Sequence, residues 1–255
     1  MASFLVDPFS HLSQVCISTK GIYSSLQNFT KILANSIEPL LFLIPDSPDT
    51  PISRFGTALK VRCNDSFFLV CTEHQFKDAD PESVVLIHEK NQKLITSHET
   101  VFFGKLPSGE PITDLRLFNF TLPVKSGEIS ETGWWDYHDR VTPEVDDFDF
   151  LVAVGYPSFS NAIDYDRLDL RLAPRGVFGL RENGALSGLS SIRLVNDLPY
   201  DPDGLSGSPA FALVKTSFGF TTKLAGIVSN AGRSQLNYLK IDDLSGLLEY
   251  ALRSR

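Results

Sequence analysis

The sequence predicts an all-β fold with a helical segment at each end, and three observations support it. From Pro39 onward, short apolar runs are separated by turn residues, which is the pattern of strands joined by tight connections. A stretch at 121–146 that contains glycines, tryptophans and a proline divides these runs into two sets. Residues 7–36 and 242–253 instead place apolar side chains at spacings of three and four, as an amphipathic helix does.

The apolar runs give two sets of expected strands. The first set is 40–44, 55–63, 66–71, 83–89, 92–97, 99–106 and 115–120, and the second set is 149–155, 168–173, 176–181, 191–195, 209–214, 219–229 and 236–241. Asn64-Asp65 predicts a two-residue hairpin turn that places Cys63 opposite Ser66. We expect three parts: an N-terminal helical extension at 1–38, a first β-barrel at 39–125, and a second β-barrel with a C-terminal helix at 126–255.

The composition is that of a globular chain with an acidic charge balance. Apolar residues make up 42% of the 255 residues, charged residues make up 21%, and the formal net charge is −8. Nucleic-acid backbones are bound by clustered Lys and Arg, and the sequence has no such cluster, so we expect no nucleic-acid partner. No apolar run approaches about 20 residues, so we expect no membrane span.

The cysteines and the first residues predict the compartment. Met1–Pro8 lacks the basic start and the apolar core of a signal peptide. The odd cysteine count, made up of Cys16, Cys63 and Cys71, fits a reducing environment better than a disulfide framework. We therefore expect a cytoplasmic protein. The histidines show no metal-ligand spacing, and no metal is expected.

A serine between two glycines is the strongest chemical signal in the sequence. The stretch 203–209 reads Asp-Gly-Leu-Ser-Gly-Ser-Pro and leads into an apolar run. A serine attacks a carbonyl when a tight turn exposes its hydroxyl, a base takes its proton and backbone N–H groups receive the oxyanion. Gly204 and Gly207 permit such a turn, and the N–H groups of Gly204 and Ser206 could form the oxyanion hole. An ordinary turn between two strands is the alternative.

The order of residues along the chain selects among the serine hydrolases. The G-x-S-x-G elbow followed by a histidine is absent, because position 208 is serine and no histidine follows His138. His74 follows an apolar run, and Asp114 opens a later one. The resulting order of His, Asp and Ser is one of the known triad orders.

Three further stretches turn this order into a resemblance. Gly56-Thr57-Ala58-Leu59 is similar to a G-T-G-F strand before the histidine, Gly204–Pro209 reads G-x-S-G-x-P, and Leu224–Ser229 ends in a G-I-V-S strand. With these motifs, residues 39–248 resemble the trypsin-like (chymotrypsin-fold) serine peptidases of the disulfide-free cytosolic or bacterial type. The resemblance implies two antiparallel six-stranded β-barrels, peptide-bond hydrolysis through an acyl-enzyme, a protein or peptide substrate and no cofactor.

The resemblance also implies a role for each site residue. His74 would be the general base, Asp114 the carboxylate that orients it, and Ser206 the nucleophile, with the N–H groups of Gly204 and Ser206 as the oxyanion hole. The pocket for the substrate side chain would have Tyr200 at its base and Ser229, Asn230 and Ala231 along one wall. No acid occupies the base position, which argues against selection of Lys or Arg.

Two positions depart from the family pattern. Glu73 stands before the histidine, where the family usually has a small residue, and Leu205 stands where an aspartate is frequent. The second departure implies that activation by burying a new amino terminus against that aspartate is not available.

Alternatives remain open at this point. Asp149, in an acidic cluster with Asp146 and Asp147, competes with Asp114 for the role of triad acid. A peptidase-like fold that no longer cleaves and serves as a protein-binding module is the main alternative function, and an esterase-like hydrolase is a further one. The N-terminal extension would either bind a regulatory partner or pack against the outside of the fold.

Overall fold

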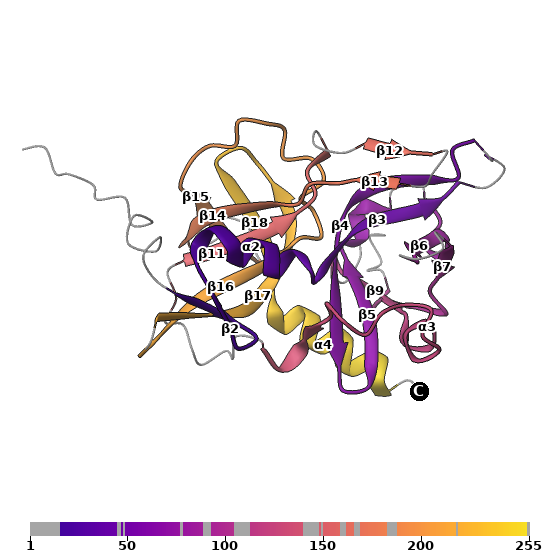
Figure 1. The fold of residues 1–255 in the computed structure, drawn as a ribbon, viewed down its shortest axis with the longest axis horizontal. Helices are drawn as coiled ribbons and strands as arrows, with labels where there is room; N and C mark the ends of the chain where they lie inside the picture. The colour runs from indigo at the N-terminus through magenta and orange to yellow at the C-terminus, as the bar shows by residue number, and fades with distance from the viewer. Residues whose placement is uncertain are drawn as a thin grey trace, which may run out of the picture.

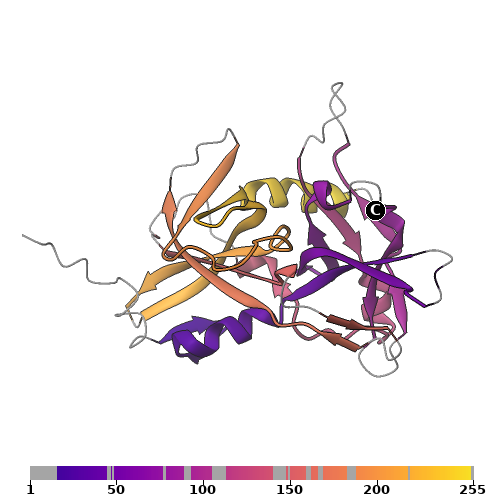
Figure 2. The same ribbon diagram turned by 90° about the horizontal axis from the view of Figure 1, so that it is seen from above.

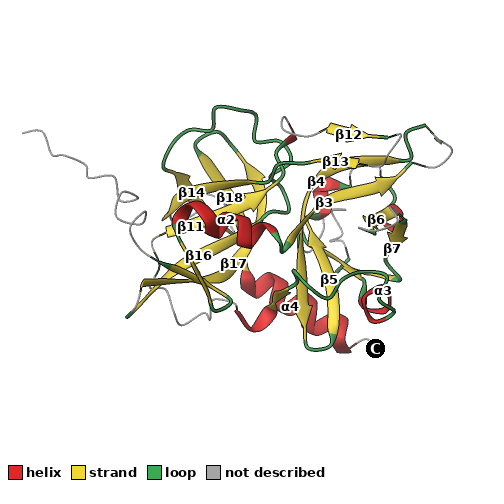
Figure 3. Ribbon diagram, in the orientation of Figure 1, coloured by secondary structure: helices red, strands yellow, loops and turns green. Residues whose placement is uncertain are grey.

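The computed structural model describes residues 16–44, 47, 49–76, 79–88, 93–104, 113–139, 148, 150–158, 162–165, 169–182, 188–217 and 219–253. Two strand-built halves lie side by side, the first half in purple and the second in orange and yellow (Figure 1). Helices are few and lie at the periphery (Figure 3). This is the predicted fold class. Within the described residues, no helix has the length and apolar character needed to cross a membrane.

The first half is a rolled antiparallel sheet. Its strands are β3 (Ile37–Leu43), β4 (Ile52–Cys63), β5 (Ser66–Cys71), β6 (Val84–Ile87), β7 (Leu94–Thr96), β8 (Glu99–Val101) and β9 (Arg116–Asn119). They are ordered β7-β6-β3-β4-β5-β9-β8, and the two-residue strand β10 (Trp135–Asp136) pairs with β4 in parallel. Because β7 pairs with β6 and β8 pairs with β9, the short segment 94–101 touches both edges of the sheet.

The second half is a closed six-stranded antiparallel barrel. Its strands are β11 (Phe150–Gly155), β14 (Arg175–Glu182), β15 (Leu189–Leu194), β16 (Pro209–Thr216), β17 (Gly219–Ala231) and β18 (Gln235–Lys240). The order β16-β11-β14-β15-β18-β17 is closed by the pairing of β16 with β17. Closure leaves no free edge among these six strands.

The N-terminal segment is only partly the helix expected from its apolar spacing. Residues 17–24 form a hairpin of β1 (Ile17–Thr19) and β2 (Ile22–Ser24), and only α2 (Leu26–Ala34) is helical. The hairpin turns at Lys20 and Gly21, whose φ angles of 50° and 76° end any helix there. β1 then adds to β17 in parallel. Residues 7–15 lie outside the described part of the chain.

One expected barrel strand lies elsewhere. The run at 168–173 corresponds to β13 (Asp169–Arg171), which among the described strands pairs only with β12 (Ala162–Asp164), in a separate two-stranded ribbon. Figure 1 shows this ribbon above the first half of the molecule. The pattern of apolar residues could not distinguish a ribbon strand from a barrel strand, because both alternate with the same period.

One of the buried hydrophobic clusters is shared by the two halves. A single buried cluster contains side chains of the first half (Leu59, Val61, Phe68 and Val70) and of the second half (Val152, Val154, Phe211 and Leu224). The C-terminal helix α4 (Ile241–Arg253) runs along both halves (Figures 1 and 2). Its Tyr250 ring lies 5.5 Å from that of Phe103, which follows β8. The halves are therefore fixed against each other.

The hairpin between β4 and β5 forms as predicted. Cys63 pairs with Ser66, and Asn64 has the positive φ of 54° that a tight hairpin turn requires. Within the described residues, none of the three cysteines forms a disulfide; Cys63 and Cys71 are buried and Cys16 is exposed.

Candidate active site

His74 is presented by a single 3₁₀ turn directly after β5. The turn η1 spans Glu73–Gln75, and the Gln75 Oε1 atom accepts hydrogen bonds from the backbone N–H and the hydroxyl of Thr72, both at 2.9 Å. This cap satisfies donors that the end of a strand would otherwise leave unpaired. The ring of His74 is consequently held at the end of β5, and its side chain is 45% exposed.

Asp114 lies beside His74, at the start of the segment that enters β9. Its carboxylate oxygens lie 2.8 Å and 3.0 Å from His74 Nδ1, and one of them also accepts the His74 backbone N–H at 3.0 Å. The contact fixes both the ring and the backbone of the histidine. Asp149, the competing acid, lies outside the described residues.

Ser206 completes a line of three side chains. Its Oγ lies 3.3 Å from His74 Nε2, on the side of the ring opposite Asp114. His74 and Asp114 are carried by the first half of the molecule and Ser206 by the turn before β16 of the second half. The three predicted triad residues are thus brought together from segments 40 and 92 residues apart in the sequence.

Ser229 touches both ends of this line. Its hydroxyl donates to Asp114 Oδ2 at 2.6 Å, and its carbonyl accepts the Ser206 hydroxyl at 3.0 Å. The resemblance predicts Ser229 in a pocket wall and does not predict its hydrogen bond to Asp114. A G-I-V-S strand gives no local sign of a carboxylate partner that is 115 residues away.

The turn that carries Ser206 needs two glycines with positive φ. Gly204 has φ 90° and Gly207 has φ 80°. A Cβ atom on Gly207 would lie 1.9 Å from the carbonyl oxygen of Thr57, and the Gly207 N–H donates to Val228 O at 2.8 Å. The carbonyl of Ser206 accepts from Thr57 N at 3.1 Å and from Gln75 Nε2 at 2.9 Å. These contacts fix the turn to β4, η1 and β17 together.

Two peptide N–H groups of the turn remain available. Asp203 O accepts from Ser158 N at 2.8 Å, and Leu205 O accepts from Ser208 N at 3.1 Å. A trans peptide directs its N–H away from its C=O, so the N–H groups of Gly204 and Ser206 point away from these donors. In the described part of the chain, neither group donates to a protein acceptor. Both can therefore serve as donors to a ligand oxygen.

Two of the four residues predicted for the side-chain pocket pack against the same part of the core. Tyr200 and Ala231 both pack against one apolar cluster, which also contains Leu205 and Tyr238. Asn230 is exposed and accepts from Asn237 Nδ2 at 2.6 Å. Burial raises the pKa of Tyr200, although the nearby Arg175 acts in the opposite direction. The phenol is therefore neutral at physiological pH.

Arg54 is a neighbour of the turn that the sequence did not identify. Its guanidinium donates to Tyr156 O and lies close to Gly204, where an added Cβ would be 2.9 Å from Arg54 Nη2. Burial lowers the pKa of Arg54 to about 10, against the attraction of Asp203. A cation thus lies beside the turn that carries Ser206.

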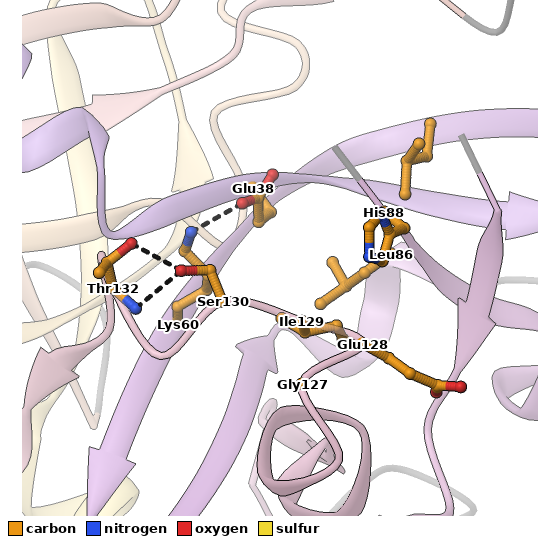
Figure 4. A pocket seen from close by; sticks show the side chains of 10 residues that line it. Glu38, Lys60, Leu86, His88, Gly127, Glu128, Ile129, Ser130 and Thr132 are labelled. Atoms are coloured by element: carbon orange, nitrogen blue, oxygen red, sulfur yellow. Dashed lines mark hydrogen bonds and ion pairs between the residues drawn. The ribbon is translucent and has the colours of Figure 1, made fainter. Parts of the chain in front are cut away.

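Other candidate sites are weaker. Within the described residues, no group of three or more His, Cys, Asp or Glu could hold a metal ion. A pocket of about 350 Å³ lies around the Glu38–Lys60 ion pair and is also lined by His88 and Ser130 (Figure 4). A second pocket of about 400 Å³ shares Glu38 and Lys60. Neither pocket is lined by the triad residues.

Comparisons with known proteins agree on the fold. Human heparin binding protein is similar, with a TM-score of 0.53 and 12% identity over 84% of this chain and 92% of that chain. A mutant of the same human protein gives a TM-score of 0.51 and 13% identity over 83% and 92%. This chain has the chymotrypsin fold. No protein-family model and no curated protein matches it.

Structural similarity at 12% to 13% sequence identity is evidence for the fold alone. It confirms the predicted fold class, whereas the disulfide-free cytosolic or bacterial type remains a prediction.

Proposed function

We propose that this chain is a serine endopeptidase that hydrolyses peptide bonds through an acyl-enzyme intermediate. One observation carries the proposal. Ser206 Oγ, the two ring nitrogens of His74 and the Asp114 carboxylate form a continuous line of contacts at 3.3 Å and 2.8 Å. This is the arrangement that a nucleophile, a general base and an orienting carboxylate require.

In the proposed acylation step, Ser206 Oγ attacks the carbonyl carbon of the scissile peptide bond. His74 Nε2 takes the hydroxyl proton, and the carbonyl π pair moves onto oxygen, where the N–H groups of Gly204 and Ser206 receive it. Each such donor contributes roughly 3 to 4 kcal/mol to lowering the barrier. The tetrahedral species then collapses: the C–N bond breaks, His74 gives its proton to the leaving amine, and an ester remains on Ser206.

Deacylation repeats these steps with water. A water oxygen attacks the ester carbon while His74 takes a proton from that water. The second oxyanion accepts hydrogen bonds from the same two N–H groups. The C–O bond to Ser206 then breaks, and His74 returns its proton to Ser206 Oγ. Asp114 holds Nδ1 protonated throughout and stabilises the imidazolium that forms in each step. All atoms and protons balance without a cofactor.

The neutral Tyr200 supports a substrate preference. We propose that the pocket formed by Tyr200, Ser229, Asn230 and Ala231 takes an uncharged side chain, because no acid stands at its base. The substrate is proposed to be a protein or peptide in the cytoplasm. Heparin binding, the property named for the similar human protein, is not carried over, because the net charge of this chain is −8.

One contact favours the alternative of a non-cleaving binding module. The Ser206 hydroxyl has a competing acceptor, since the Ser229 carbonyl lies at 3.0 Å and His74 Nε2 at 3.3 Å. A hydroxyl that stayed on Ser229 would not pass its proton to His74. The two functions differ in whether peptides are turned over or only bound.

The test compares Ser206 with Ser208, two residues further along the turn. A fluorophosphonate probe should form one adduct on Ser206, and Ser206→Ala should abolish the adduct and lower kcat on a peptide library by on the order of a millionfold, the scale measured in another serine protease. Ser208→Ala is the matched control, because the Ser208 hydroxyl is buried and has no hydrogen-bond partner among the described residues. Labelling of Ser208, or a folded wild type that binds peptides without cleaving them, would exclude the peptidase.

A further inference from the structure

A buried ion pair lies directly beside the His74–Asp114 contact. Arg116 donates to Glu73 through Nε at 2.5 Å and through Nη2 at 2.8 Å, so the pair is bidentate. Its side chains are only 8% and 13% exposed. Glu73 immediately precedes His74, and Arg116 follows Asp114 by two residues. The pair therefore spans the two segments that must hold the base and its carboxylate together.

Aromatic rings hold the guanidinium in place. The Arg116 Cζ atom lies 4.2 Å from the ring centroid of Phe102 and 5.3 Å from that of Phe76. The backbone adds a second tie, because Glu73 N donates to Asp114 O at 3.2 Å. A bidentate guanidinium between two rings has little rotational freedom, which makes it suited to fixing one segment against another.

Stability alone does not explain this pair. Burying two charges costs desolvation free energy, and apolar residues of similar size often serve stability equally well. The pair also has an electrostatic consequence: close to His74, the charge of Glu73 and the charge of Arg116 cancel. Asp114 contacts the His74 ring, and Glu73, Arg116 and Asp114 all lie within electrostatic reach of the Cys71 thiol of β5. With Glu73 and Arg116 balanced, Asp114 is the uncompensated charge.

We propose that Glu73 and Arg116 are positioning residues of the proposed peptidase, which fix η1 to the start of β9 and keep the net charge next to His74 equal to that of Asp114. The proposal rests on the proposed function. It assigns a purpose to Glu73, which replaces the small residue that the resemblance leads one to expect.

The first measurement is the pH dependence of kcat/KM in two single variants. Glu73→Gln leaves the Arg116 cation unbalanced, which disfavours the imidazolium, so the acidic midpoint of the profile should move to lower pH. Arg116→Gln leaves the Glu73 carboxylate unbalanced and should move the midpoint to higher pH. Each shift should be about half a unit to one unit. A merely structural pair would not move the two midpoints in opposite directions.

A third variant separates charge from geometry. Arg116→Lys keeps the charge balance and loses the bidentate fork, so the midpoint should stay while kcat falls about tenfold or more with KM unchanged. The matched control is the double variant Arg62→Gln, Asp136→Asn, which removes an exposed ion pair of 2.6 Å in the same half of the molecule. It should leave the profile and kcat unchanged.

Failure of this inference differs from failure of the proposed function. A wild type that takes up the fluorophosphonate on Ser206 and cleaves peptides, with midpoints of both glutamine variants unmoved or moved the same way, overturns the inference alone. A wild-type kcat in Arg116→Lys overturns the geometric part. A wild type that neither reacts nor cleaves overturns both. Thermal unfolding of each variant verifies that the chain is folded in the assay.

Discussion

Asp114 is the residue on which most contacts of the candidate site converge. Its carboxylate accepts from the His74 ring, from the His74 backbone and from the Ser229 hydroxyl. The donors come from two segments of the chain and engage both carboxylate oxygens, which restricts rotation of the carboxylate. A single residue thereby sets the orientation of the base relative to both halves of the molecule.

Asp114→Asn should keep the fold and cut turnover on the order of ten-thousandfold, the loss known for this substitution in a well-studied serine protease. The reason is that an amide can donate to His74 Nδ1, which then carries no proton and leaves Nε2 unable to act as a base. Steady-state kinetics on a cleaved peptide measures the loss. Asp149→Asn should change little, and the reverse result would assign the acid to Asp149.

A second prediction at the residue scale concerns the reactivity of the three cysteine thiols. Cys16 is exposed, whereas Cys63 and Cys71 are buried, and burial raises the pKa of the Cys71 thiol. An alkylating reagent at neutral pH reacts with the thiolate, so it should modify Cys16 in the folded protein and all three cysteines after unfolding. Mass spectrometry counts the adducts. A Cys63–Cys71 bridge in protein isolated without oxidant would argue against a reducing compartment.

At the scale of the element, the Ser206 turn depends on the close approach of its backbone to β4. Gly207 has φ 80°, and the carbonyl oxygen of Thr57 lies where a Cβ atom on Gly207 would need space. Gly127 has nearly the same φ, 79°, but an added Cβ there meets nothing within 4 Å. Substituting Gly127 would therefore introduce backbone strain alone, whereas substituting Gly207 would introduce the same strain and a steric clash.

Gly207→Ala should lower the rate of fluorophosphonate labelling by more than about a hundredfold, because the turn must move away from β4 and take Ser206 with it. Gly127→Ala should cost only the strain of a positive φ, about 1 to 2 kcal/mol of unfolding free energy, with labelling unchanged. Labelling rates and chemical denaturation measure both effects. An unchanged labelling rate in Gly207→Ala would mean that the turn does not need its position against Thr57.

The elements also show what the sequence could predict. Some strands made of continuous apolar runs were located closely, since β5 coincides with the expected 66–71 and β11 begins one residue after the expected 149. The helix expected over 7–36 was wrong at 17–24, because spacings of three and four also occur by chance across a short hairpin. Gly21, which lies inside the expected helix, has a positive φ and forms the hairpin turn.

At the scale of the whole molecule, the candidate site lies where the two halves meet. His74, Asp114 and Ser206 could be proposed from their order and local context. The contacts that join the halves could not be predicted from the sequence. Thr57 Oγ1 donates to Gly204 O at 2.8 Å across 147 residues, and Gln75 Nε2 donates to Ser206 O across 131 residues. Such pairs carry no periodic signal and depend on how the two halves pack.

Because the candidate site is divided between the two halves, it can form only late in the synthesis of the chain. A ribosome makes the chain from its N-terminus, and domains fold as they are completed. Synthesis delivers His74 and Asp114 early, whereas the nucleophile arrives much later, and its turn still needs Val228 and Ser229 of β17 for hydrogen bonds. A nascent chain thus holds a base and an acid with nothing to activate. The proposed hydrolytic activity would appear only after β17 has been made and has paired with β16.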